Sequence, residues 1–213
     1  MARHHEHAPA PRRLRTALLC ATVALAIGAC GSNPAYFRGD VMSVKDSTRV
    51  AVLPLVNLTK DVNAADIASN AVIVELMATH RFTVVDPGIV EDEVQRERLR
   101  LTDRLPLPAL QAVGAALGVD YVFVGTVNEY TMLRETQVDI PEVSISLRMV
   151  SCSTGSIAWA STHSKRGDDS EVLFTLGRVQ TLEQLASLTA REMMQTFMSD
   201  QGSSKHHQKK GTS

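Results

Sequence analysis

The chain has 213 residues, with 22 lysines and arginines against 23 aspartates and glutamates, and its formal net charge at pH 7 is −1. Proteins that bind nucleic acids through the phosphates carry a strongly basic face, so this charge balance argues against that class. Residues 48–199 are enough for one domain with a sizeable hydrophobic core.

The amino-terminal residues have the pattern of a leader that directs export. Three arginines, Arg12, Arg13 and Arg15, precede the uncharged and mostly apolar residues 16–29. This run is too short to cross a bilayer as a permanent helix, which predicts that the leader is removed.

The end of the leader resembles the lipobox of bacterial lipoproteins, because Ile27, Gly28 and Ala29 stand directly before Cys30. In that motif an aliphatic residue stands three places before the cysteine, and small residues fill the next two. The resemblance implies a signal peptide over residues 1–29, cleavage between Ala29 and Cys30, and lipidation of Cys30 on its thiol and its new amino group. Several acyl chains anchor a protein stably where one does not. An ordinary secretory leader, or a single membrane anchor with an incidental cysteine, is the alternative.

Loss of the leader changes the charge and the cysteine count. The remaining chain has 18 basic and 22 acidic side chains, a net charge of −4. Cys20 leaves with the leader and Cys30 carries lipid, so Cys152 has no partner for a disulfide bond and is expected to pack as a small buried hydrophobic residue. Gly31 stands where many lipoproteins of the inner membrane have an aspartate, and this analogy favours the outer membrane.

The domain is expected to begin with a strand behind a tether. Residues 30–47 are polar, contain glycine and proline and lack periodicity, which predicts a flexible tether behind the lipidated cysteine. The β-branched run from Arg49 to Val56 predicts a strand that ends or bulges at Pro54.

A helix is predicted over residues 64–79, with Asp61 or Asn63 as its cap. Its apolar residues recur at helical spacing: Ile67, Ala71, Val74 and Ala78. His80 follows at the end of the helix, where a histidine more often favours the helix dipole than binds a metal.

The rest of the chain continues the alternation of strands and helices. The predicted elements are a strand at Phe82–Val85, a helix from Asp86 to about Leu99, a helix at Leu107–Leu117, a central strand at Asp120–Val127, a connection at Glu129–Pro141, strands at Glu142–Met149 and Ser156–Ser164, a charged loop at Lys165–Ser170, and a helix at Thr181–Met198. This order predicts an α/β (α+β) layered sandwich, a single domain over residues 48–199 with a mixed sheet of about five strands and about four helices. Residues 200–213 form a polar tail that is expected to be disordered.

The sequence has none of the common nucleophile, zinc or phosphate-binding motifs. We therefore expect no catalytic residue, no cofactor and no metal site. The acidic residues Asp168, Asp169 and Glu171 are more typical of a solvated loop than of a cation site.

Three further patterns have a structural interpretation. The tail contains three lysines and two histidines, Lys205, His206, His207, Lys209 and Lys210. We interpret them as solvated side chains, with weak binding of metal, anionic glycan or lipid as the alternative. Asn57, Leu58 and Thr59 match a glycosylation sequon but fit a turn at the end of a strand. The charged residues of the helix at 86–99 favour a solvated face, with a docking surface as the alternative.

Four segments, taken in this order, resemble one group of bacterial envelope proteins. They are VAVLPL with NLT at residues 50–59, FTVVD at 82–86, ALGVDYVFVGTV at 116–127 and TGSIAW at 154–159. The chain resembles the CsgG/LpoB-type lipoproteins over about residues 48–198. This group shares an anticodon-binding-like α/β core with the amino-terminal domain of TolB, and none of the four segments is a catalytic motif.

The resemblance implies a non-enzymatic outer-membrane lipoprotein whose periplasmic domain binds a protein partner in envelope assembly, either in peptidoglycan-synthase activation or in export or surface-structure assembly. The alternative is a ring-forming secretion-channel subunit, which needs homo-oligomers and two long membrane-spanning hairpins per subunit. Each spanning strand needs about 9–11 residues. The connection predicted at residues 129–141 carries Arg134, Glu135 and Asp139 and leaves no room for such hairpins.

Overall fold

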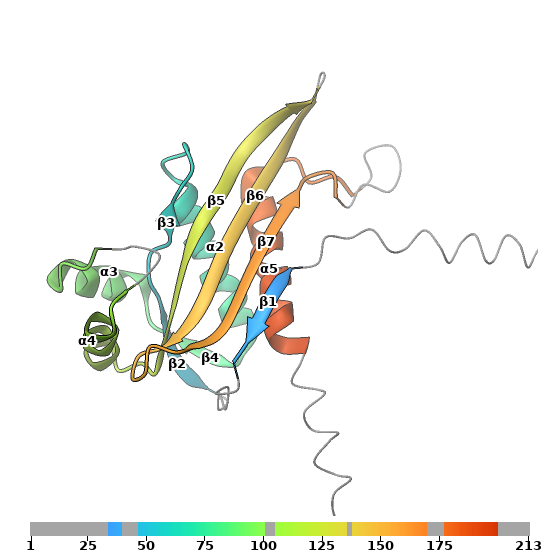
Figure 1. The fold of residues 1–213 in the computed structure, drawn as a ribbon. Helices are drawn as coiled ribbons and strands as arrows, with labels where there is room; N and C mark the ends of the chain where they lie inside the picture. The colour runs from blue at the N-terminus through green and yellow to red at the C-terminus, as the bar shows by residue number, and fades with distance from the viewer. Residues whose placement is uncertain (1–33, 40–46, 101–104, 136–137, 170–176, 200–213) are drawn as a thin grey trace, which may run out of the picture. The chain divides into compact units, whose positions relative to one another are not determined.

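The computed structural model describes residues 34–39, 47–100, 105–135, 138–169 and 177–199 (Figure 1). Within these ranges the chain forms β1 (Ala35–Arg38), β2 (Thr48–Val52), β3 (Val56–Asn57), α2 (Ala64–Ala78), β4 (Phe82–Val84), α3 (Pro87–Arg96), α4 (Leu107–Leu117), β5 (Tyr121–Glu135), β6 (Val138–Ser151), β7 (Ile157–Arg166) and α5 (Leu182–Ser199). The layered α/β class and its single mixed sheet are confirmed.

The sheet has seven strands in the order β1-β7-β6-β5-β2-β4, and β3 also pairs with β5. β2 runs parallel to β4 and to β5, whereas β5, β6, β7 and β1 pair in antiparallel fashion. Pro54 lies between β2 and β3 and divides the strand predicted at residues 49–56. The sheet therefore has two strands more than the five that were expected.

The expectation that residues 30–47 lack regular structure is wrong for Ala35–Arg38. These residues form β1 on the outer edge of β7, with Ala35 opposite Thr162 and Arg38 opposite Trp159. Aromatic residues favour strands, but four residues after a proline give no periodic signal. The edge of β7, which is distant in sequence, supplies the pairing.

The connection predicted at residues 129–141 is also wrong, because it belongs to a long hairpin. β5 has 15 residues and β6 has 14, and they pair as far as Glu135 and Val138. A bulge shifts the register between Val127 and Glu129, so that Tyr130 rather than Glu129 faces the core. Because of this shift, apolar and polar residues do not alternate regularly along β5, so the sequence pattern does not show the full length of the strand. The hairpin is part of the core, because Tyr130 of β5 and Val143 of β6 are buried under the helices.

The predicted apolar stripe of α2 is rotated from the observed one. Val74 and Ala78 are exposed, whereas Ala68, Val72 and Leu76 are buried. α2 is apolar around most of its circumference, so helical spacing alone does not select the buried side.

The helices cover the sheet unequally (Figure 1). α2 and α5 pack on one face and share a core with β2, β4, β5, β6 and β7. α3 and α4 pack on the other face, over β2 and the ends of β5 and β6. The central and outer parts of β5, β6 and β7 on this second face have no helix over them among the described residues.

Four aromatic rings join the strands to α5 in the larger core. Phe82 lies 5.7 Å from Phe123 and 5.1 Å from Phe197, and Trp159 lies 6.3 Å from Phe123 and 5.9 Å from Phe197, measured between ring centroids. Contacts of this kind contribute about 0.5–1.5 kcal/mol each beyond the burial of apolar area.

Gly114 brings α4 close to Cys152 in the smaller core. A Cβ atom on Gly114 would lie 2.5 Å from the Cβ of Cys152 and 3.2 Å from the carbonyl oxygen of Val119. The first distance is well below van der Waals contact and the second is a tight contact, so only glycine fits here without a shift of the helix or of Cys152.

We expect Gly114→Ala to lower the free energy of unfolding by about 1–3 kcal/mol, because α4 must move away from Cys152. Ala115→Ser, at the exposed neighbouring position, is the control and should change it by less than about 0.5 kcal/mol. Urea denaturation followed by circular dichroism measures both. Equal midpoints for the two variants would contradict the close contact.

Candidate functional site

The uncovered part of the sheet carries a row of polar side chains. Thr126 Oγ1 donates to Asn128 Oδ1 (2.7 Å), and Asn128 Nδ2 donates to Ser146 Oγ (2.9 Å). Ser146 Oγ lies 3.0 Å from Thr162 Oγ1, so hydrogen bonds run from β5 across β6 to β7. We call Thr126, Asn128, Ser146 and Thr162 the polar row.

Strand alternation places the polar row on this face. Ile145 and Leu147 of β6 are buried under α2 and α5, so Ser146 and Arg148 point to the opposite side. Cross-strand pairing then aligns Ser146 with Thr126 and with Thr162.

A groove of about 580 Å³ lies along the polar row. Its lining residues come from β3 and the residue after it, Leu58, and from β5, β6 and β7: Val56, Leu58, Gly125, Thr126, Ser146, Leu147, Arg148, Ala160, Ser161 and Thr162. Leu58 is 62% exposed at its border. Hydroxyl and amide groups next to apolar side chains suit an extended segment of a partner, because they give hydrogen bonds and apolar contact together. The arrangement offers no paired nucleophile and base.

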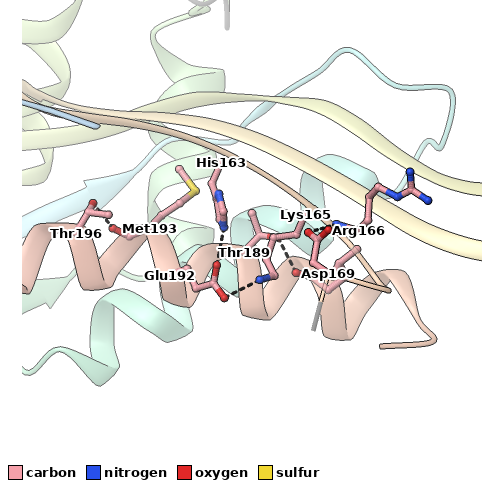
Figure 2. Close-up of polar contacts among 9 residues, drawn as sticks. His163, Lys165, Arg166, Asp169, Thr189, Glu192, Met193 and Thr196 are labelled. Carbon is pink, nitrogen blue, oxygen red and sulfur yellow. Dashed lines mark hydrogen bonds and ion pairs between the residues drawn. The ribbon is translucent and has the colours of Figure 1, made fainter. Parts of the chain in front are cut away.

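A second polar cluster joins β7 to α5 (Figure 2). His163 and Lys165 are buried and point from β7 toward Glu192 on α5. His163 Nε2 lies 2.6 Å from Glu192 Oε2, and Lys165 Nζ lies 2.7 Å from Glu192 Oε1. Arg191 on the same helix pairs with Glu75 on α2 at 3.0 Å. The cluster positions α5 and lies on the side of the sheet away from the groove.

The pKa of Glu192 is lowered from its ordinary range. Burial alone would raise this pKa, but the hydrogen bonds from Lys165 and His163 and the charge of Lys165 outweigh that effect. The glutamate therefore stays ionised beside the buried lysine.

The prediction of a charged loop beginning at Lys165 is wrong, since Lys165 and Arg166 belong to β7.

In the part of the chain that the structure describes, the residues singled out from the sequence do not form one site. Cys30 and its cleavage partner Ala29, Glu171 of the acidic cluster, and the tail residues including His206 and His207 lie outside the described residues. Cys152 is buried, as expected, and burial together with the nearby Asp120 raises its pKa to about 11. Such a thiol is a poor nucleophile at neutral pH.

The other sequence candidates have structural roles. Asp169 accepts a hydrogen bond from the backbone of Arg166 at 2.8 Å, and Asp168 pairs with the Arg166 side chain at 3.2 Å. Asn57 Oδ1 accepts hydrogen bonds from the backbone and side chain of Thr59, both at 2.9 Å, which confirms the predicted turn after a strand. His80 follows α2 in the left-handed backbone region.

Two searches of the described residues for other kinds of site were negative. No group of three or more His, Cys, Asp or Glu side chains is placed to hold a metal ion in this part of the chain. No helix among the same residues is long and apolar enough to cross a membrane.

The family model described as "Peptidoglycan-synthase activator LpoB" matches residues 34–164. The chain belongs to the LpoB family. The match begins directly before β1 and ends within β7, so it includes every residue of the polar row. A search of curated protein sequences finds no significant match.

Solved structures support the fold of this LpoB-family chain. A PelC dodecamer from Paraburkholderia phytofirmans is 16% identical, with a TM-score of 0.52 over 76% of this chain and 96% of that chain. The lipoprotein GNA1162 from Neisseria meningitidis is 19% identical, with a TM-score of 0.50 over 70% of this chain and 99% of that chain. These similarities establish the architecture alone.

The polar row and the β7–α5 cluster were both missed in the sequence. The alternation of Ser144, Ser146 and Arg148 with apolar residues marks one face of β6 as polar. The partners of that face on β5 and β7 depend on the register and on the bulge, which the sequence pattern does not specify.

We expect Glu192→Gln to lower the free energy of unfolding by about 1–3 kcal/mol at pH 7, because buried Lys165 loses its charged partner. Since the native pKa of Glu192 is lowered, its contribution is complete above the pKa of an unfolded glutamate, about 4.3. It is lost as the pH falls through the native value. The difference between wild type and variant should therefore shrink below pH 4.

Urea denaturation at a series of pH values measures this difference. Glu91→Gln, at an exposed position on α3, is the control for loss of a carboxylate. A difference for Glu192→Gln that stays constant from pH 7 to pH 3 would contradict a role for the ionised carboxylate.

Proposed function

We propose that the chain is a non-enzymatic, lipid-anchored outer-membrane protein whose periplasmic domain binds and activates a peptidoglycan synthase. The observation that carries this proposal is membership of the LpoB family over residues 34–164. Cys30 is the anchor in this proposal, after cleavage behind Ala29. No cofactor or metal takes part.

The open groove is the surface that we assign to the partner. It lies within the matched residues; its hydrogen-bonding groups stand on paired strands, and exposed Leu58 directly follows β3. A protein segment laid across β5, β6 and β7 would meet the polar row and the apolar side chains at once. Such contact can activate an enzyme only by binding one of its conformations more tightly than another.

A ring-forming assembly is the second candidate, and the PelC dodecamers favour it. In that case copies of the chain would bind one another, and an export or surface-structure pathway would replace peptidoglycan synthesis. The secretion-channel form of this candidate needs two long membrane-spanning hairpins per subunit, whereas Tyr130 and Val143 of the β5–β6 hairpin are packed in the core.

Crosslinking of intact envelopes separates these candidates. After solubilisation in mild detergent, mass spectrometry of the crosslinked products should identify a peptidoglycan synthase, and the purified protein should then raise the rate of glycan polymerisation by that enzyme. Crosslinks only between copies of this chain in a closed ring would support the assembly candidate instead.

We expect Cys30→Ala to yield a folded protein that is no longer membrane-bound, because the acyl chains need the thiol. Fractionation with and without detergent measures this. A variant that still needs detergent for extraction would contradict the lipobox interpretation.

We expect Leu58→Arg to weaken binding of the crosslinked synthase by about tenfold, since a charge placed in an apolar contact typically costs 1–2 kcal/mol. Val74→Arg is the matched control, because Val74 on α2 is 61% exposed and lies on the other side of the sheet. Titration of each purified variant against the synthase measures the dissociation constants. Equal values would contradict the groove as the docking surface.

A further inference from the structure

We infer that the β1 edge of the sheet lies against the phospholipid surface, with Tyr36 and Phe37 at the level of the headgroups. The inference rests on the lipid anchor at Cys30 proposed above. It adds an orientation and a second membrane contact that the anchor alone does not specify.

The first argument is the length of chain between the anchor and the domain. Only four residues, 31–34, separate Cys30 from Ala35, where β1 begins. A polypeptide spans at most about 3.6 Å per residue, so the Cα atoms of Cys30 and Ala35 are at most about 18 Å apart, whatever the arrangement of the residues between them. The 15 residues of β5 are about 50 Å long at about 3.4 Å per residue. The start of β1 therefore stays within about 18 Å of the anchored cysteine, a distance well under the length of β5.

The second argument is the place where the chain joins the sheet. Ala35 lies opposite Thr162 of β7, which lies opposite Ser146 of β6. This is the level of the polar row, well away from the hairpin end at Glu135 and Val138. The short tether consequently draws the side edge of the sheet, rather than the hairpin tip, toward the membrane.

The third argument is the chemistry of β1 itself. Tyr36 is 52% exposed and Phe37 is 56% exposed. As neighbours in a strand they project to opposite faces, so both can reach a surface that the edge of the strand approaches. Aromatic side chains favour the boundary between water and hydrocarbon, and a tyrosine hydroxyl can remain hydrated there.

An outer edge strand also has backbone groups that need partners. Among the described strands only β7 pairs with β1, so the outer edge of β1 has no strand beside it there. Phospholipid headgroups and their water can satisfy N–H and C=O groups, whereas the hydrocarbon interior cannot. Contact at headgroup depth also blocks edge-to-edge pairing between copies, which is the usual hazard of an open edge.

Fluorescence quenching by lipids tests the inference on the full-length lipidated protein in vesicles of phosphatidylethanolamine and phosphatidylglycerol with brominated acyl chains. Two variants are compared, Phe37→Trp on β1 and Ile89→Trp on α3, because Ile89 has a matched exposure of 55%. Native Trp159 is retained, since its burial gives a constant background. We expect the brominated lipid to quench the added emission of Phe37→Trp and to leave that of Ile89→Trp unchanged.

Lengthening of the tether gives a second readout. Insertion of 20 glycine and serine residues between Gly31 and Ser32 adds about 25 Å of average reach. This insertion should reduce the quenching of Phe37→Trp while the protein still floats with the vesicles.

The possible failures can be told apart. A protein that does not float with the vesicles would overturn the anchor, and the inference with it. A protein that floats but shows equal quenching at both positions, or none, would overturn the orientation alone. Protection of Phe37→Trp from aqueous iodide without quenching by brominated lipid would show that another protein chain covers β1, and this would also overturn the membrane contact.

Discussion

The packing of α5 on the sheet through Phe82, Phe123, Trp159 and Phe197 is the contact on which the rest of the domain depends. These residues come from three strands and one helix that are far apart in sequence, so their contact fixes β4, β5 and β7 relative to α5. Because α5 is the last of the described elements, the cover that α2 begins on this face is complete only when α5 packs beside it. Closing contacts of such sequence separation costs chain entropy, and burial of large aromatic surfaces compensates for that cost.

Because α2 and α5 cover one face of the sheet, the opposite face of its strands carries polar side chains. Strand alternation requires that a strand with Ile145 and Leu147 under the helices presents Ser146 and Arg148 on the opposite side. α3 and α4 cover only the β2 end of that side, and the polar row with its groove occupies the remainder. The surface that we assign to a partner is thus a consequence of how the core is built. Apart from Leu58, its side chains stand on paired strands.

Polar groups are also used inside the fold, where His163 and Lys165 meet Glu192 between β7 and α5. A buried ion pair gives little net stability compared with apolar packing, but it strongly disfavours arrangements that leave a charge unpaired. The ion pair can therefore fix the position of α5 along β7, whereas the neighbouring aromatic contacts stabilise the packing of α5 on the sheet. β1 extends the same edge of the sheet beyond β7.

The sequence by itself determined the order of the helices and main strands and the resemblance to LpoB-type proteins, because these depend on local composition and periodicity. The leader with its cysteine motif stays a prediction. The sequence also specified the burial of Cys152 and the turn at Asn57. Tertiary structure decided the rest. β1 needs the edge of β7, the length of the β5–β6 hairpin depends on a bulge that reverses the alternation after Val127, and the buried side of α2 depends on what packs against it. The polar row exists only when three strands are placed in register, and no local pattern contains that information.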